Sequence, residues 1–368
     1  DAPQYYMSNS SAAAPSGYYF IGDAAISTGS ERFLYYFDMV NKSVMPLCTK
    51  LNCEHNSQDC DAYVSDKSRV TGGLWYYNNR LYMIERTDEK DLLVSYDKTG
   101  RDKKTEAVLS VNGMSVVSSR QRACFSHGKL YYILTSEKTQ YLYYVQVGTN
   151  TQPQFIKEYS TVYGIRETIT LYPVGEKVYV KLVSGITDVT NDYILESIDI
   201  NDNNVSKVYD YMSDGSIFRG EADDWNNGAY IDESGNMYFI SLTEDSYILN
   251  KMNTVSKDNE EIFVIDLSQD TGKKEAYTDF LGIDDKYIYI LERVDFSIAE
   301  NRKNKELKNK LDILDTKGNI VDVIEFTTND KYAKENQVGT EGNGLQFDFF
   351  NGDSRYMLFA VEGYSKTG

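Results

Sequence analysis

A short aromatic-rich motif recurs seven times along the chain. Each copy is a polar turn with Gly, Asp or Asn followed by a run of aromatic and aliphatic residues; Ser16–Phe20 is the first copy and Gly128–Tyr132 a later one. The central residues of the copies stand at positions 19, 82, 131, 179, 238, 288 and 356. The shorter separations, about 48–50 residues, equal the length of four short strands with their turns. The repeat therefore predicts an all-β chain, a seven-bladed β-propeller of four-stranded antiparallel blades.

A second strand follows each aromatic run and ends in Asp or a close substitute. Phe33–Asp38, Leu92–Asp97 and Ile262–Asp266 are examples, and Lys98–Gly100 is a typical turn after such a strand. Alternation of apolar and polar residues with Gly or Asn in the turns is the signature of antiparallel hairpins. A weaker strand after the turn then completes each predicted blade.

The repeat predicts a single domain in which the chain runs blade by blade. The predicted blades span about 8–48, 72–110, 121–160, 168–211, 227–278, 279–326 and 344–368. Blade 7 has residues for only two strands, so residues 1–7 should close it, with Gln4–Met7 as a strand on its open edge. The alternative is an open or six-bladed ring with an additional hairpin. Only Ala299–Leu311 is typical of a helix, inside a long loop of blade 6.

The composition excludes some partners. The 368 residues contain 38 Lys and Arg against 56 Asp and Glu, a net charge of −18, which argues against a nucleic acid or an anionic membrane surface as partner. A hydrophobic content of 41% is enough for a large core, and 32 Tyr favour strands. The sequence contains only two His, so few residues are available for His-based catalysis.

One loop combines three of the four cysteines with a histidine. Cys48, Cys53, His55 and Cys60 lie in the predicted connector between blades 1 and 2. Three thiolates and one imidazole would complete a tetrahedral zinc site, but the spacing is not that of a standard finger, and exported proteins tend to oxidise cysteines. A disulfide, a zinc site and free thiols therefore stay open. In the crosslinked cases we expect the three cysteines to meet and support the loop, without a role in catalysis. Cys124 is expected to be a small core residue.

A second candidate site joins predicted blades 4 and 5. Asp223, Asp224, Trp225 and Asn226 combine carboxylates, an amide and an indole, which suits stacking on a sugar ring and hydrogen bonds to its hydroxyls. The alternative is a solvated acidic turn in which Trp225 packs as an anchor.

The repeats and the cysteine loop resemble known propeller families. The aromatic strands with their Asp-Gly turns are similar to YWTD and TolB-type propellers. More narrowly, Gly17–Phe20, Leu34–Asp38 and the run Pro46–Tyr63 resemble uncharacterised propeller lipoproteins exported by Gram-positive gut bacteria. The resemblance implies an extracellular protein, held at the membrane only through a lipid anchor that is removed here, and it implies no activity.

These observations favour a cell-surface binding or scaffold protein. The long connectors Cys48–Thr71, Met212–Asn227 and Thr327–Asn343 would present a binding face to a glycan or a protein. Motifs of hydrolases, nucleotide-binding enzymes and zinc proteases are missing from the sequence. The alternative is a carbohydrate-active hydrolase or lyase with carboxylates at the channel mouth. We expect no cofactor other than zinc at the cysteine loop.

Overall fold

The computed structural model divides the chain into two compact units, which are described one at a time. Unit 1 comprises Asp1–Tyr6, Asp188–Thr190 and Tyr211–Gly368, and unit 2 comprises Met7–Thr187 and Asn191–Asp210. The structure describes residues 4–5, 11–23, 31–66, 70–117, 122–136, 139–160, 168–187, 190–210, 230–232, 234–242, 246–266, 276–284, 286–294, 308–326, 345–352 and 357–363. Across these ranges no helix is long and apolar enough to cross a membrane.

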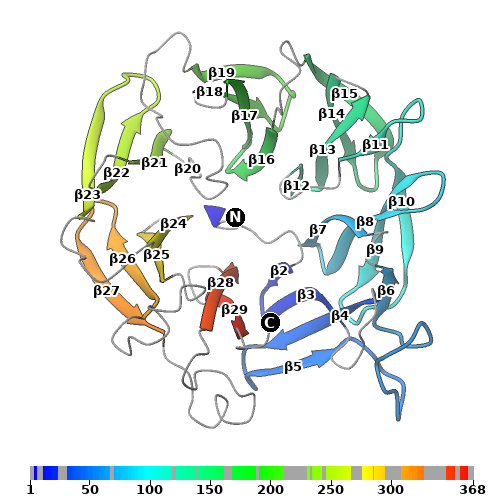
Figure 1. The fold of residues 1–368 in the computed structure, drawn as a ribbon. Coiled ribbons are helices and arrows are strands. Elements are labelled where there is room, and N and C mark those ends of the chain that lie inside the picture. Colours follow the sequence, from blue (N-terminus) through cyan, green and yellow to red (C-terminus); the bar gives the residue numbers. More distant parts are fainter. Residues whose placement is uncertain are drawn as a thin grey trace. The chain divides into compact units, whose positions relative to one another are not determined.

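The described residues of unit 2 form four antiparallel sheets, which we call blades 1 to 4 (Figure 1). Blade 1 has the order β2-β3-β4-β5 with β6 also on β4, blade 2 has β7-β8-β9-β10, blade 3 has β11-β13-β14-β15 with β12 also on β13, and blade 4 has β16-β17-β18-β19. The strands of blades 1 and 2 are β2 (Ser11–Ala14), β3 (Gly17–Asp23), β4 (Glu31–Asp38), β5 (Ser43–Pro46), β6 (Tyr63–Asp66), β7 (Val70–Tyr77), β8 (Arg80–Arg86), β9 (Asp91–Asp97) and β10 (Lys104–Val108). Those of blades 3 and 4 are β11 (Ser115–Val116), β12 (Ala123–Ser126), β13 (Lys129–Ser136), β14 (Thr139–Gln146), β15 (Asn150–Ser160), β16 (Thr168–Val174), β17 (Lys177–Thr187), β18 (Thr190–Asp199) and β19 (Val205–Asp210).

The core of unit 2 lies between successive blades. One buried cluster joins blades 1 and 2, a second joins blades 2 and 3, and a third joins blades 3 and 4. Tyrosines of the repeat fill these layers, and their hydroxyls reach a neighbouring blade. Tyr19 of blade 1 donates to the Lys98 carbonyl of blade 2 at 3.0 Å, and Tyr132 of blade 3 donates to the carbonyl of Leu109, which follows blade 2, at 3.1 Å. The aromatic repeat therefore supplies both apolar area and hydrogen bonds between blades.

Unit 1 contains three further sheets. Their orders are β20-β21-β22-β23, β1-β24-β25-β26-β27 and the hairpin β28-β29. The strands are β1 (Gln4–Tyr5), β20 (Tyr230–Ile231), β21 (Asn236–Leu242), β22 (Ser246–Asn253), β23 (Asn259–Asp266), β24 (Ala276–Ile283), β25 (Tyr287–Val294), β26 (Lys310–Asp315), β27 (Ile320–Glu325), β28 (Leu345–Gly352) and β29 (Met357–Gly363). A buried cluster that includes Tyr238, Phe280 and Ile288 joins the first two sheets.

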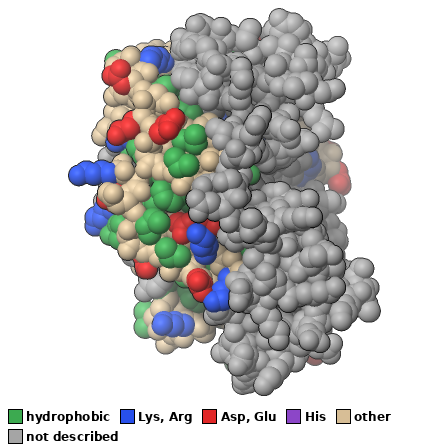
Figure 2. Space-filling view, turned by 60° about the vertical axis from the view of Figure 1, so that its left-hand side comes forward, with side chains coloured by type: hydrophobic (Ala, Val, Ile, Leu, Met, Phe, Trp, Pro, Cys, Tyr) green, Lys and Arg blue, Asp and Glu red, His purple; other side chains and the backbone are tan. Residues whose placement is uncertain are grey.

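The outer strands of unit 1 carry exposed apolar side chains. Ile320, Val321, Val323 and Ile324 on β27 and Val264 on β23 are all exposed. Figure 2 brings forward the side of the molecule that carries these strands, where hydrophobic side chains lie among charged ones. β-Branched residues suit an extended backbone even where little covers them, so this composition fits outer strands.

The structure confirms an all-β propeller fold with four-stranded antiparallel blades. Six of the seven repeats lie at a strand, β3, β8, β13, β17, β21 or β25, and in each of those sheets that strand pairs with the one that follows it. Of the seventh repeat the structure describes only Met357, which begins β29, the partner of β28. The predicted number of blades is wrong, however. Among the described residues six sheets have four or more strands, whereas β28 and β29 form a two-stranded hairpin. Each copy of the repeat indicates one antiparallel hairpin, which has two strands. The pattern does not indicate whether two further strands complete a blade.

Two further predictions need correction. Gln4 and Tyr5 do not pair with the last sheet; they pair with Ile283 and Gly282 of β24, the strand that would otherwise leave an open edge in its sheet. The helix predicted at Ala299–Leu311 does not reach its predicted end, because Lys310 and Leu311 begin β26. Residues 299–307 lie outside the described part of the chain.

Candidate metal centre

The cysteine loop lies within the outer edge of blade 1. β5 pairs with Tyr35–Asp38 and β6 pairs with Glu31–Phe33, so both lie along the same edge of β4. Leu34 joins the two halves, because its carbonyl accepts the Leu47 N–H at 2.9 Å and its N–H donates to the Ala62 carbonyl at 2.8 Å. The loop is therefore an insertion of residues 47–62 into the outer strand, and its predicted position as a connector from blade 1 to blade 2 was wrong.

The four predicted ligands meet at one point of this insertion. The thiol sulfurs of Cys48, Cys53 and Cys60 and a ring nitrogen of His55 all lie within 4.8 Å of one another. His55 Nδ1 lies 3.3 Å from Cys60 Sγ. In a tetrahedral zinc site with Zn–S near 2.3 Å and Zn–N near 2.0 Å, the donor atoms are about 3.5–3.8 Å apart. The cluster therefore needs only a small contraction to fit a metal ion.

Two residues of the loop have a left-handed backbone, and three backbone N–H groups donate to cysteine sulfurs. Asn52 and His55 have φ values of 58° and 54°, in the left-handed region that Asn and His adopt more readily than most residues. The backbone N–H groups of Lys50 and Asp61 donate to the Cys48 sulfur, and the N–H of Ala62 donates to the Cys60 sulfur. In two of these contacts the donor stands two residues after the cysteine. Such donors stabilise the thiolate form that a metal ion requires.

The thiols differ in their tendency to ionise. Burial, with the neighbouring Cys53 and Cys48, raises the pKa of Cys60 to about 12. Burial acts against ionisation at Cys48 too, but the N–H groups of Lys50 and Asp61 hold the pKa of Cys48 below its ordinary value. Cys48 therefore ionises more readily than Cys60, and a bound cation would favour the thiolate form of both.

Packing and ion pairs hold the ends of the loop. Cys60 is 4% exposed and packs in a cluster with Phe33 and Ala62, both 0% exposed. Asp61 accepts a hydrogen bond from Thr49 Oγ1 at 3.1 Å, and Lys50 Nζ lies 3.4 Å from its carboxylate. Blade 1 therefore holds the two ends of the loop in place, and with them the ligands Cys48 and Cys60.

All four cysteines are free thiols in the structure. Of the three possibilities left open by the sequence, the disulfide is therefore the one that the structure does not contain. Cys124 is 4% exposed and packs in the cluster between blades 3 and 4, which confirms its predicted place in the core.

The second predicted site cannot be compared with the structure. Asp223, Asp224, Trp225 and Asn226 lie outside the described residues, and so do the predicted connectors Met212–Asn227 and Thr327–Asn343.

A pair of buried carboxylates is present in unit 1. Asp312 is 1% exposed and Glu292 is 9% exposed, and Lys310 Nζ lies 3.4 Å from Asp312 and 2.7 Å from Glu292. Burial, followed by the hydrogen bond and charge of Glu292, raises the pKa of Asp312 to about 6. Paired carboxylates of this kind can serve acid–base chemistry, but they can equally form a structural ion-pair cluster.

The comparisons with known proteins identify no family. No protein-family model matches the chain, and no curated protein matches it. Solved structures similar to it include TolB from Acinetobacter baumannii, with a TM-score of 0.43 and 10% identity over 85% of this chain and 64% of that chain. A protein from Lactobacillus plantarum has a TM-score of 0.45 and 10% identity over 84% of this chain and 82% of that one.

An oligogalacturonate lyase in complex with manganese is also similar, with a TM-score of 0.40 and 10% identity over 70% of this chain and 67% of that chain. The chain spans less than two thirds of the length of the TolB chain, 64%. TM-scores below 0.5 support no statement about activity, and the propeller fold follows here from the strand pairing of the chain itself.

Proposed function

We propose that this chain is an extracellular binding or scaffold protein whose outer-strand insertion in blade 1 is stabilised by a structural zinc ion. The observation that carries the proposal is the convergence of three sulfurs and one imidazole nitrogen within 4.8 Å. Thiolate and imidazole are ligands that favour zinc over magnesium or calcium. The location outside the cell is supported by the resemblance of the run Pro46–Tyr63 to exported lipoproteins.

The donor set favours a structural role for the metal. A catalytic zinc ion keeps one coordination position for water or substrate, whereas a structural site is filled by four protein ligands. Cys48, Cys53, His55 and Cys60 supply four. A zinc ion here would therefore fix the loop and would leave no position for a substrate.

A metal site also accounts for the whole cluster better than a disulfide. One disulfide would use two of the three sulfurs and would leave the third thiol and His55 without a role. A metal ion uses all four groups and gives a reason for the left-handed backbone at His55, φ 54°, which costs about 1 kcal/mol in most non-glycine residues.

The proposal is tested by measuring zinc in the purified protein by elemental analysis, followed by substitution with cobalt. We expect one zinc ion per chain and, with cobalt, the absorption bands of a tetrahedral site with sulfur ligands. Cys53→Ser should abolish stoichiometric binding. Cys124→Ser is the matched control, because it removes a thiol far from the loop and should leave the zinc content unchanged. Zinc-free protein from zinc-replete medium, or full zinc content in Cys53→Ser, would contradict the metal site.

A carbohydrate-active hydrolase or lyase is the second candidate, favoured by the buried pair of Glu292 and Asp312. We expect binding without turnover, so product analysis of glycans incubated with the protein should show no cleavage. Cleavage that Asp312→Asn abolishes would establish the enzyme in place of the binding protein.

A further inference from the structure

A shallow cleft of about 720 Å³ lies beside the proposed metal centre, between blade 1 and the β9–β10 turn of blade 2. Asp61 and Tyr63, at the end of the cysteine loop, line one side. Arg101 and Lys103, in the segment between β9 and β10, line the other, and Tyr96 of β9 also contributes. The cleft is open to solvent and combines aromatic rings with charged groups, a lining suited to a polar ligand.

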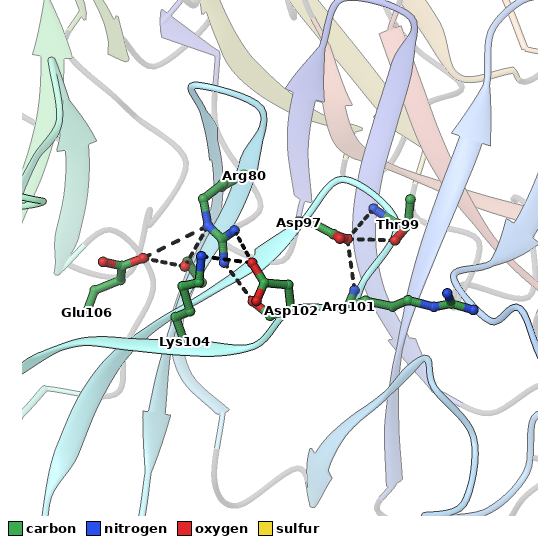
Figure 3. Close-up of polar contacts among 8 residues, drawn as sticks. Arg80, Asp97, Thr99, Arg101, Asp102, Lys104 and Glu106 are labelled. Carbon is green, nitrogen blue, oxygen red and sulfur yellow. Dashed lines mark hydrogen bonds and ion pairs between the residues drawn. The ribbon is translucent and has the colours of Figure 1, made fainter.

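The β9–β10 turn is held rigidly. Oδ1 of Asp97 accepts the backbone N–H of Thr99 at 2.8 Å, the Thr99 hydroxyl at 2.6 Å and the N–H of Arg101 at 3.0 Å (Figure 3). Gly100 lies directly against the base of the cysteine loop, because a Cβ at this position would be 3.0 Å from the Leu47 Cβ. The two walls of the cleft therefore touch each other, and neither has to be ordered when a ligand binds.

Most charges around the cleft already have close partners. Lys103 Nζ contacts both carboxylate oxygens of Glu85, at 3.0 and 2.7 Å. Asp102 pairs with Arg80 and with Lys104, each at 2.9 Å (Figure 3).

Arg101 is the exception. Its guanidinium points away from the turn in Figure 3, its side chain is 54% exposed, and its ion pair with Asp61 is long, at 3.9 Å. Asp61 itself has the closer contacts with Thr49 and Lys50 described above. A guanidinium offers five N–H donors in a planar fork that matches a carboxylate. Among the described residues that line the cleft, Arg101 is thus the cation with the longest ion pair, and its guanidinium has the geometry that recognises a planar oxyanion.

We propose that this cleft binds an acidic glycan, with a uronate carboxylate held by Arg101 and the adjacent sugar ring placed against Tyr63. This inference rests on the proposed binding function and adds to it a site and a ligand class. A glycan fits better than an acidic peptide, because a shallow open site with an aromatic ring suits a flat sugar ring and its hydroxyls.

The test measures binding at about 0.15 M salt, where the net charge of −18 repels a polyanion over only about 8 Å. The probes are alginate oligosaccharides, carboxyl-reduced alginate and a polyglutamate peptide of similar charge. Arg101→Gln should weaken alginate binding about tenfold or more. Lys98→Gln is the matched control, since it removes the same charge from the same turn at an exposed residue outside the cleft, and it should bind like the wild type.

Each outcome decides the inference. Alginate binding that depends on Arg101 and on the carboxyl groups would support it. Equal binding by Arg101→Gln, preference for polyglutamate, or no alginate binding would overturn it. The zinc content of each variant is measured in the same preparation. A zinc-loaded wild type that does not bind alginate would refute the glycan cleft alone, whereas a wild type without zinc would refute the proposed metal site.

Discussion

Replacing Gly100 with alanine tests whether the β9–β10 turn packs on the cysteine loop as the structure shows. Gly100 has a φ of +81°, and an added Cβ would lie 3.0 Å from the Leu47 Cβ and 3.2 Å from the Leu47 carbonyl oxygen. Gly148, in the turn between β14 and β15, has nearly the same φ, +80°, but has nothing within 4 Å of its Cβ position. The two variants therefore share the backbone cost and differ in the contact.

The left-handed backbone should cost each alanine variant about 1–2 kcal/mol of unfolding free energy. Gly100→Ala should lose about 1–3 kcal/mol more, because Leu47 has to shift to relieve the overlap. Leu47 directly precedes Cys48, so the same shift should make the protein release zinc to a chelator faster than Gly148→Ala does. Urea unfolding monitored by tyrosine fluorescence measures the free energies. Equal losses in the two variants would show that the turn and the loop do not touch.

Three further perturbations address the metal, a buried carboxylate and a link between blades. Removing zinc with EDTA should lower the free energy of unfolding by about 2–4 kcal/mol, as the loss of other crosslinks does. It should also allow proteases to cut within residues 49–59. An unchanged cleavage pattern would argue against a loop supported by a metal ion. Asp312→Asn should stabilise the protein by about 1–3 kcal/mol at pH 7.5, because burial raises the pKa of Asp312 to about 6 and disfavours its charged form in the folded chain. That gain should shrink as the pH falls through 6 and should be below about 1 kcal/mol near pH 4, where Asp312 is protonated in the folded chain and about half ionised in the unfolded chain, whose carboxyl has the ordinary pKa of 3.8. Urea unfolding at pH 7.5 and at about pH 4 checks this, and a gain that does not depend on pH would contradict it. Glu196→Gln should cost about 1–3 kcal/mol, because the buried carboxylate of Glu196 contacts Lys157 Nζ at 2.6 Å and the Tyr159 hydroxyl at 3.0 Å. In the exposed pair of Glu325 with Lys308 the same change should cost less than about 0.5 kcal/mol, and similar costs at the two sites would refute the distinction.

The turns could be predicted from the sequence because their interactions are local. Asp38, Asp97 and Asp315 each end a strand, and each carboxylate accepts the N–H of the residue two positions later at 2.8 Å. The side chain, the acceptor and the donor lie within a few residues of one another, so a sequence pattern contains the whole interaction. The six aromatic strands that the structure describes could be predicted for a similar reason, since alternation of apolar and polar residues within one strand indicates which face is buried.

The pairing of distant segments could not be predicted in this way. Gln4 and Tyr5 add to β24 because that strand has an open edge, and no local pattern reports which edge is open. Likewise, Ile262–Asp266 was predicted as the second strand after the aromatic run, but it lies in β23, one strand further out, because β22 occupies the predicted place. Alternation indicates that a segment is a strand and does not give its order in the sheet.

The cleft was missed for a different reason. Arg101 and Lys103 are ordinary residues after a hairpin turn, and Asp61 is an ordinary loop residue. Only the packing of blade 2 on blade 1 brings them to one site. The one sequence signal was Gly100 in the turn, which marks a close approach of backbones but does not say what approaches.

The position of the cysteine loop explains why it needs a crosslink of its own. An outer strand has one neighbour, so an insertion there breaks no second row of hydrogen bonds, and the blade can accept it. The insertion leaves two four-residue strands, β5 and β6, where a continuous strand would have stood. The ends of the loop are held by Leu34, by the cluster around Phe33 and by the contacts of Asp61. Near the middle of the loop, Cys53 packs against that cluster as a partly buried side chain, and His55 lies 3.3 Å from the Cys60 sulfur. A metal ion bound by Cys48, Cys53, His55 and Cys60 would connect the middle of the loop to both ends, and it would hold Asp61 in place at the wall of the cleft.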